Sequence, residues 1–207
     1  MTERSPASSA GKGRPRSEQA KVAVMDTARI LFEQQGYAGA TIEAISGRSG
    51  VAKTTIYRWW PNRVALLVDV LVEMAMALVP PPRGNDPMRA MRTELRGIAG
   101  ALNGPLGRLL MSLLGEAQQD AQVRKVLVNR LFRPRTEASA ANIGRAQTDG
   151  AIRADVPPEV AIDLLVGPLF YRAFVQHHPV SEAYVKQVLE YVMEGLRMRP
   201  ARRERRR

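Results

Sequence analysis

The sequence predicts an all-α protein of about nine helices, with a three-helix helix-turn-helix module at the N-terminus and a larger helical domain after it. Apolar residues recur at helical spacing along most of the chain, and no segment shows the alternation of a half-buried strand. Pro, Gly and Asn divide this pattern into helix-sized segments. At 207 residues, the chain is long enough for one small module and one domain with its own core.

Positive charge is concentrated at the two ends of the chain. Residues 1–63 carry 10 Lys and Arg against 5 Asp and Glu, residues 64–196 carry 14 of each kind, and residues 197–207 carry 7 against 1. A basic module on a neutral body suits attraction to nucleic-acid phosphates. The alternative is that the ends are solubilising tails, which we favour for 201–207. For residues 11–16 both interpretations stay open, since an Arg-rich arm can enter an A·T-rich minor groove.

The composition also bounds the location of the protein. The chain has no cysteine, which excludes disulfides and thiolate chemistry and fits a reducing cytoplasm. Its N-terminus lacks the apolar core of an export signal. The longest apolar run, residues 65–79, contains Asp69 and Glu73 and is shorter than the roughly 18 residues that span a bilayer. We therefore expect a soluble, cytoplasmic protein without membrane contact.

The first elements are a basic arm and a buttressing helix. Residues 1–16 are rich in Ser, Gly and Pro and are expected to be disordered. A helix is expected from near Ser17 to Gly36. Its apolar stripe consists of Val24, Ala28, Leu31 and Phe32.

Two short helices joined by a tight turn are expected next. Thr41 is suited to cap the first of them, and Glu43 lies near the positive end of its dipole. Gly50 can adopt the positive φ that a sharp turn needs. The second helix opens near Val51 and is too polar and cationic for a core. This combination indicates a helix-turn-helix in residues 17–63 whose second helix faces DNA.

The stretch resembles the DNA-binding domain of the tetracycline-repressor (TetR) family. The shared positions are Gly36-Tyr37, Thr41, Gly50-Val51, Tyr57, Trp59-Trp60 and Arg63. The resemblance covers about residues 19–79, which include a fourth, linking helix. Two positions depart from the family pattern: Ala52 replaces the usual capping Ser or Thr, and Thr54 replaces a frequent Gly. Loss of the cap is expected to weaken the start of the second helix by about 1 kcal/mol.

Side-chain chemistry and this resemblance together predict the DNA contacts. Lys53 and Thr54 are expected to reach base edges, with Lys53 favouring guanine. Hydroxyl, indole and guanidinium donors are expected to hold phosphates. These donors are Thr41, Thr55, Tyr57, Trp59 and Arg63, with Arg48 and Arg58 as secondary candidates. Ile56 and Trp60 are expected in the core. An aromatic residue at helical spacing is usually buried, but the family position of Tyr57 favours DNA contact.

The remaining helices form the expected second domain, residues 80–197, followed by a basic tail, residues 198–207. Asn62 is a suitable cap for the linking helix, which ends at Pro80-Pro81-Pro82. Asp86-Pro87 and Asn103-Gly104-Pro105 each predict the end of one helix and the start of another, with Pro at the first helical position. Further helical segments are expected over 106–117 and over 120–150, where Pro134 is expected to kink or split the helix. A largely apolar helix follows Pro157, and Ser181 is expected to cap the last one.

The last two helices predict a homodimer. The segment 162–175 is apolar on every side and needs more cover than one subunit supplies. In the TetR family the last two helices pair with those of a second subunit in a four-helix bundle. The resulting interface is expected to contain Leu164, Leu165, Leu169, Phe174, Val185, Val188, Leu189 and Val192. A two-fold dimer also matches two half-sites about 34–36 Å apart. The alternative is that these are ordinary core helices of a monomer.

The resemblance further implies a small-molecule effector pocket in the second domain. Its expected lining is Met74, Met88, Met91, Leu95, Met111, Leu114, Leu131, Phe132 and Phe170. Each of these side chains is equally suited to a core. An apolar or aromatic ligand is favoured, although Arg92, Arg96 and Arg124 offer partners for an anion. Binding would shift the population toward a conformer that does not fit DNA.

The expected function is thus a ligand-responsive transcriptional regulator, a repressor that binds a palindromic operator as a dimer. The alternative is an architectural protein that coats DNA with little sequence preference. An enzyme is not expected, because the sequence shows no nucleophile motif, and adjacent His177 and His178 do not face one another on a helix. No metal or cofactor is expected.

Overall fold

The computed structural model describes residues 14–82 and 84–197, which are helical with no strand among them. These residues divide into two compact units, and the boundary falls between Val70 and Leu71. The described residues form nine helices when helical segments that continue into one another are counted as one. The all-α prediction is confirmed. Most of the expected N-terminal arm, residues 1–13, and the basic tail, residues 198–207, lie outside the described residues.

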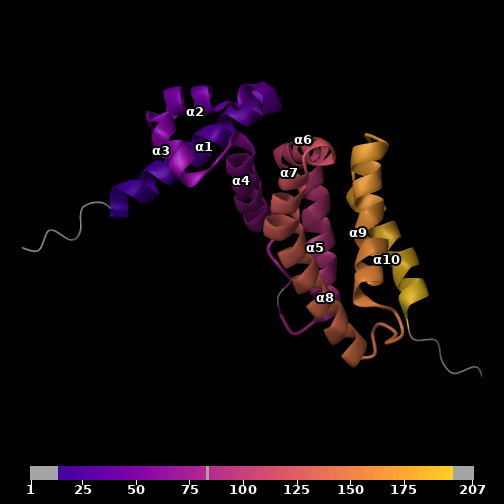
Figure 1. Ribbon diagram of the computed structural model, residues 1–207. Helices are drawn as coiled ribbons and strands as arrows, with labels where there is room; N and C mark the ends of the chain where they lie inside the picture. The colour runs from indigo at the N-terminus through magenta and orange to yellow at the C-terminus, as the bar shows by residue number, and fades with distance from the viewer. Residues whose placement is uncertain (1–13, 83, 198–207) are drawn as a thin grey trace, which may run out of the picture. The chain divides into compact units, whose positions relative to one another are not determined.

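The first unit is built on a long helix, α1 (Arg14–Gly39), drawn in indigo in Figure 1. The helix begins three residues earlier than expected. It kinks at Gly36, where φ is 71°, and then continues to Gly39. Gly36 was expected to end the helix, and its positive φ does break the regular backbone there. The predicted stripe, Val24, Ala28, Leu31 and Phe32, is buried.

Two short helices and a long one follow: α2 (Ile42–Ser49), α3 (Lys53–Trp59) and α4 (Arg63–Leu78). The side chain of Asn62 caps α4, because its Oδ1 accepts a hydrogen bond of 2.8 Å from the backbone N–H of Ala65. Residues 65–68 are buried, so α4 contributes to the core of the first unit. The boundary between the two units falls within this one helix.

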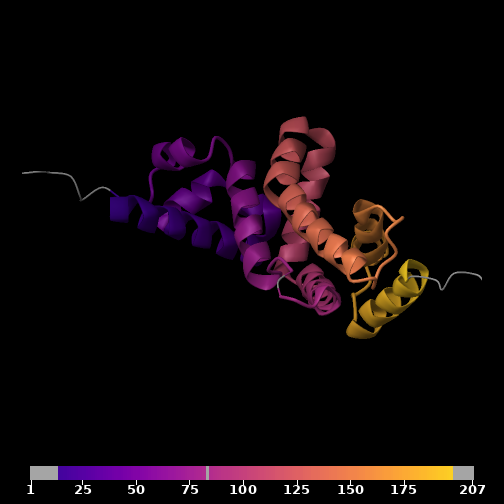
Figure 2. The same ribbon diagram turned by 90° about the horizontal axis from the view of Figure 1, so that it is seen from below.

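The second unit contains the remaining helices. They are α5 (Pro87–Leu102), α6 (Pro105–Gln119), α7 (Ala121–Leu127), α8 (Arg133–Thr148), α9 (Pro158–Phe170) and α10 (Glu182–Leu196), with two π-helical turns, η1 (Val128–Phe132) and η2 (Tyr171–Val175). Pro87 and Pro105 stand in the first turns of α5 and α6, as predicted. Ser181 caps α10 by accepting from the N–H of Tyr184 at 3.2 Å, also as predicted. In both views α10 lies alongside α9 at one edge of this unit (Figures 1 and 2).

Each π-helical turn lies close to a proline. Pro134 was expected to kink or split its helix, but η1 joins α7 to α8 without a break. The N–H of Arg133 bonds to the carbonyl of Val128, five residues earlier. A proline has no N–H and crowds the preceding turn, and the wider π-turn accommodates both effects. Pro168 lies within α9, and η2 begins three residues after it.

No helix among the described residues combines the length and the apolar character needed to cross a membrane.

Candidate nucleic-acid interface and ligand cavity

The turn between α2 and α3 is fixed by local hydrogen bonds. Thr41 Oγ1 accepts from the N–H of Ala44 at 3.1 Å and caps α2. Gly50 has a φ of 70° and donates its N–H to the carbonyl of Ser46, while Ser46 Oγ donates to the carbonyl of Val51 at 2.8 Å. Both sequence predictions, the Thr41 cap and the left-handed Gly50, are confirmed. These bonds set the direction in which α3 leaves the turn.

Two buried side chains hold α3 against the rest of the first unit. Ile56 is fully buried and Trp60, just after the helix, is 3% exposed, as predicted for both. The indole Nε1 of Trp60 donates to Asp69 Oδ2 on α4 at 2.7 Å. At the other end, Ala52 provides no side-chain cap. The helix is therefore held by its C-terminal half, through packing and one charge-assisted hydrogen bond.

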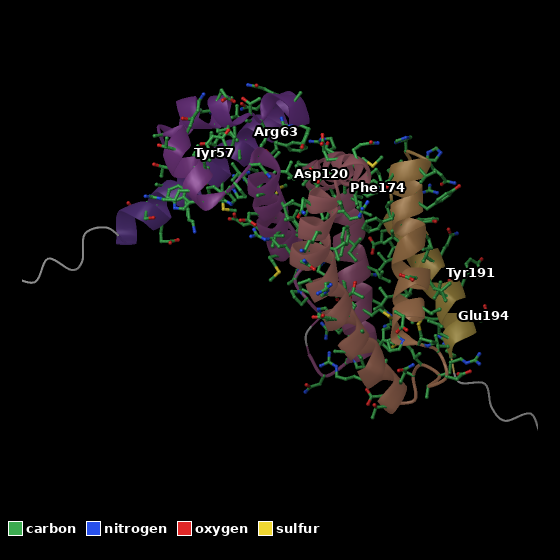
Figure 3. All side chains as sticks on the ribbon, viewed as in Figure 1. Tyr57, Arg63, Asp120, Phe174, Tyr191 and Glu194 are labelled. Atoms are coloured by element: carbon green, nitrogen blue, oxygen red, sulfur yellow. The ribbon has the colours of Figure 1, made fainter. Side chains whose placement is uncertain are left out.

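The opposite side of α3 is open to solvent. Lys53, Thr54, Tyr57 and Arg58 are exposed, and the Tyr57 ring retains 48% of its accessible surface. Figure 3 labels Tyr57 on this helix. Thr55 and Trp59 are half-buried. The helix contains no acidic residue and has Arg58 in its last turn, so this side presents hydroxyl, phenol and cationic groups without a carboxylate from α3 itself.

Two of the cations expected to contact DNA are paired inside the first unit. Lys53 Nζ lies 2.9 Å from Glu43 Oε1 on α2, and both side chains are exposed. The hydrogen bond from Lys53 is the main cause that lowers the pKa of Glu43 below its ordinary value. Arg48 Nη1 donates to Gln34 Oε1 on α1 at 2.8 Å. The partners lie 10 and 14 residues away, on other helices, so helical spacing alone did not reveal them.

Arg63 and Thr41 are the most restrained of the expected phosphate donors. The Arg63 guanidinium lies 4.3 Å from the centroid of the Tyr37 ring, and its Nη1 donates to the Tyr37 carbonyl at 3.3 Å. Both Arg63 and Thr41 are half-buried. The cation–π contact holds Arg63 at the start of α4 (Figure 3). Its remaining N–H groups are available to a ligand outside the molecule.

The second unit contains a cavity of about 120 Å³. Its walls come from α4, α5, α6, η1, α8 and α9. The lining residues are Ala75, Val79, Glu94, Ile98, Ala101, Leu102, Leu106, Leu110, Leu131, Phe132, Arg135, Thr136, Ser139, Ile162, Val166 and Phe170. Of the residues expected from the sequence, Leu131, Phe132 and Phe170 line it.

The other expected pocket residues lie elsewhere. Met91 and Leu95 line a smaller hollow of about 20 Å³, which shares Glu94 and Ser139 with the cavity. Met74, Met88 and Leu114 are half-buried outside the cavity lining, and Met111 is 40% exposed on α6. An apolar side chain fits a core, a cavity wall or a surface equally well, so its type alone does not distinguish these places.

The cavity has one polar side, which the sequence did not reveal. Ser139 Oγ on α8 donates to Glu94 Oε1 on α5 at 2.7 Å, and Arg135 Nη2 on α8 donates to the carbonyl of Val79 at 2.7 Å. Burial raises the pKa of Glu94, although Ser139 and the charge of Arg135 act in the opposite direction. Burial also lowers the pKa of Arg135.

The arginines proposed from the sequence as anion partners are not in this cavity. Arg92, Arg96 and Arg124 are exposed. Arg96 pairs with Glu182 at 3.2 Å and lines a second hollow, of about 690 Å³, beside the Pro80–Pro82 segment.

The sequence does contain one indication of Glu94, which is an acidic residue between Met91, Leu95 and Ile98 on the apolar side of α5.

The expected dimer residues divide into two groups. Leu165, Leu169, Val185 and Val188 are buried within a single subunit, which corrects their expected place: they belong to its core and have almost no surface to offer a partner. Leu164 is 46% exposed, and Phe174, Leu189 and Val192 are half-buried. Further apolar surface lies on the same helices. It comes from Val160, Tyr171, Val175 and Tyr191.

The arrangement of the elements agrees with two known sequence patterns. The pattern of bacterial regulatory proteins of the tetR family matches residues 24–70, and that of tetracycline repressor-like C-terminal domains matches residues 81–192, more than half of the chain. The chain belongs to the TetR family of transcriptional regulators. The family resemblance predicted from the helix-turn-helix residues is thereby confirmed.

Relatives within the TetR family extend over nearly the whole chain. The HTH-type transcriptional regulator YdeS of Bacillus subtilis (strain 168) is 29% identical over 185 residues, 89% of this chain and 93% of YdeS. The crystal structure of the TetR family regulator SCO0332 has a TM-score of 0.74 at 28% identity, covering 88% of this chain and all of SCO0332. Thermus thermophilus FadR, a TetR family repressor crystallised with lauroyl-CoA, has a TM-score of 0.67 at 21% identity, covering 87% and 97%, which shows the common fold.

Proposed function

We propose that this TetR family member is a repressor that binds a palindromic operator as a homodimer and leaves it when a small molecule fills the cavity. The observation that carries the proposal is the course of α4. Its first residue, Arg63, is held on Tyr37 in the first unit, its last turn supplies Ala75 to the cavity wall, and Val79, which follows the helix directly, lines the same wall. One continuous helix thus connects the candidate reading module with the candidate effector site.

The exposed side of α3 is the proposed reading surface. Lys53 and Thr54 contact base edges, and Tyr57, Arg58 and Thr55 hold the flanking phosphates. Arg63 and Trp59 donate to the backbone from the edge of this surface, and Thr41 and Arg48 do so from α2. The exposure of Lys53, Thr54, Tyr57 and Arg58 supports this assignment, and so does the absence of acidic groups from α3.

The outer side of α9, η2 and α10 is the proposed dimer surface. It combines the accessible part of the expected set with exposed apolar neighbours. The full surface is Val160, Leu164, Tyr171, Phe174, Val175, Leu189, Tyr191 and Val192. Exposed apolar side chains gathered on adjacent helices are typical of an interaction site. A two-fold pair would present two copies of α3 to successive major grooves.

A small-molecule effector is supported by the cavity itself and by a structural neighbour. The FadR structure contains lauroyl-CoA. The cavity in this chain is bounded mainly by apolar side chains and has a few convergent polar groups, which is the usual composition of a ligand site. Its volume of about 120 Å³ favours a small molecule as the proposed effector.

Footprinting with the purified chain on genomic DNA tests the regulatory function. Discrete palindromic protection supports the proposal, whereas uniform coverage favours the architectural alternative. A protein with no affinity for DNA at low salt would contradict both functions. Lys53→Ala is expected to blur sequence preference, and Tyr57→Ala to weaken binding to every sequence. Lys125→Ala removes the same charge from an exposed position on α7 and is the matched control.

A further inference from the structure

Arg135 has a hydrogen-bond donor that the fold does not use. Its Nη2 donates to the carbonyl of Val79, but its Nη1 is buried and has no hydrogen-bond partner among residues 14–82 and 84–197. Buried N–H donors almost always have partners, so an unpaired guanidinium nitrogen at a cavity wall calls for an acceptor supplied from outside the chain. The Arg135 side chain also lines the cavity, with Nη1 itself covered by protein atoms.

Glu94 supplies the complementary group at the same cavity. Its Oε1 accepts from Ser139, and its side chain lines the wall together with Arg135. The positive charge of Arg135 favours the carboxylate form of Glu94. With both groups ionised, the two charges cancel. An anionic ligand would leave a net negative charge in a largely apolar site, and a cation would leave a net positive one, both of which are costly.

The volume limits the size of the occupant. A cavity of about 150 Å³ lined by apolar side chains binds benzene. At about 120 Å³ this cavity is close to that size, and Phe132 and Phe170 contribute to its walls. Aromatic walls favour an aromatic guest through offset or edge contacts. One six-membered ring therefore suits the space.

We propose that the cavity binds an uncharged single-ring molecule with one hydroxyl group, a simple phenol, whose hydroxyl donates to Glu94 and accepts from Arg135. The proposal rests on the proposed effector function, because it assigns the chemical class of the molecule that fills the same cavity. A phenol satisfies the unused Nη1 donor and brings no net charge. A phenol that accepts from Arg135 also lies next to the guanidinium group whose Nη2 donates to the carbonyl of Val79, just after α4.

Isothermal titration of the full chain with four single-ring probes tests the ligand class. Phenol is expected to bind with a Kd on the order of 10 µM to 1 mM, as suits a ligand of this size. Anisole cannot donate to Glu94, and toluene can neither donate nor accept, so each is expected to bind at least about 10-fold more weakly. Benzoate is also expected to bind more weakly than phenol. Equal binding of phenol and toluene, or stronger binding of benzoate, overturns the proposal.

Glu94→Gln provides a second test with a distinctive outcome. The variant keeps the side-chain shape but leaves Arg135 as the only charge in the cavity, so the order of phenol and benzoate is expected to reverse. Glu137→Gln makes the same change at an exposed position on α8 outside the cavity lining and should leave the order unchanged. If Glu94→Gln does not fold, the ranking of the four probes on the unchanged chain still decides.

These measurements need no operator, so they fail or succeed separately from the regulatory proposal. A chain that binds phenol in the predicted order but shows no sequence-specific DNA protection keeps the ligand class and loses the repressor function. A chain that protects a palindrome and responds to none of the phenols keeps the repressor function and loses the ligand class.

Discussion

Lys53 at the start of α3 and Glu43 in the first turn of α2 form an ion pair, with 2.9 Å between Nζ and Oε1. The residue proposed to read bases is therefore engaged with a carboxylate on the neighbouring helix. When α3 approaches DNA, the carboxylate faces the same negative potential that attracts Lys53. The pair competes with the duplex for the lysine.

Glu43→Gln is accordingly expected to strengthen DNA binding. Removing one exposed negative charge beside α3 should raise the affinity for operator and non-operator DNA by about 2- to 5-fold at low salt, with a smaller gain at higher salt. Fluorescence anisotropy over a salt series measures the effect. Glu137→Gln in the second unit serves as the charge-matched control. Weaker binding by Glu43→Gln would mean that the ion pair positions Lys53 for DNA.

A second prediction concerns the link between Trp60 and Asp69. Trp60→Phe keeps an aromatic ring in the buried site but removes the 2.7 Å hydrogen bond to Asp69 Oδ2. Because that bond involves a charged, half-buried carboxylate, its loss is expected to lower the free energy of unfolding by about 1–3 kcal/mol. Urea unfolding followed by circular dichroism measures the change. Trp59→Phe, at the half-buried neighbouring ring, is expected to cost less, and equal losses would contradict the assigned role.

The sequence predicted the features that depend on neighbouring residues. The caps formed by Thr41 and Asn62 and the positive φ of Gly50 follow from residue type and local position. The pairs Lys53–Glu43 and Arg135–Val79 join different segments of the chain, and no local pattern specifies them. Gly36 was expected to end the first helix but only kinks it. A glycine with a positive φ interrupts the helical backbone in either case, so the sequence alone does not distinguish a kink from a helix end.

The orientation of α9 was harder to predict. The helix is apolar on nearly every side, so its pattern has no polar stripe that marks the solvent side. Leu164 and Leu165 are adjacent and chemically identical, yet one is 46% exposed and the other is buried. Only the packing of α9 against α5, α8 and α10 distinguishes them. The methionines were hard to place for a different reason, because an apolar side chain suits a core, a cavity wall or a surface equally well.

A third prediction uses the raised pKa of Glu94. Its pKa in the folded chain lies above the ordinary value of 4.5, mainly because of burial. Between these two values the folded chain binds more protons at this site than the unfolded chain does. Stability is therefore expected to fall as pH rises from 4.5 through the raised pKa.

The comparison of Glu94→Gln with the unchanged chain isolates this contribution, since Glu43 and Asp155 have lowered pKa values and act in the opposite direction. The urea midpoint of Glu94→Gln minus that of the unchanged chain is expected to rise as pH increases above 4.5 and then to level off. A difference between the two proteins that stays constant from pH 4 to pH 8 would contradict the raised pKa of Glu94.

The last prediction concerns the proposed dimer surface. Leu164→Arg places a cation in the middle of the exposed apolar strip on α9, where a partner subunit would have to desolvate it. We expect dimerisation to weaken by about 100-fold or more, because an unpaired buried charge costs several kcal/mol, and we expect binding to a two-half-site operator to fall with it. Sedimentation velocity measures the first effect and a gel-shift assay the second. Met111→Arg makes the same substitution at a 40% exposed position on α6 and should remain dimeric. Wild-type sedimentation by both variants would show that the α9 surface is not the dimer contact, since Leu164 would then face solvent in the assembled protein.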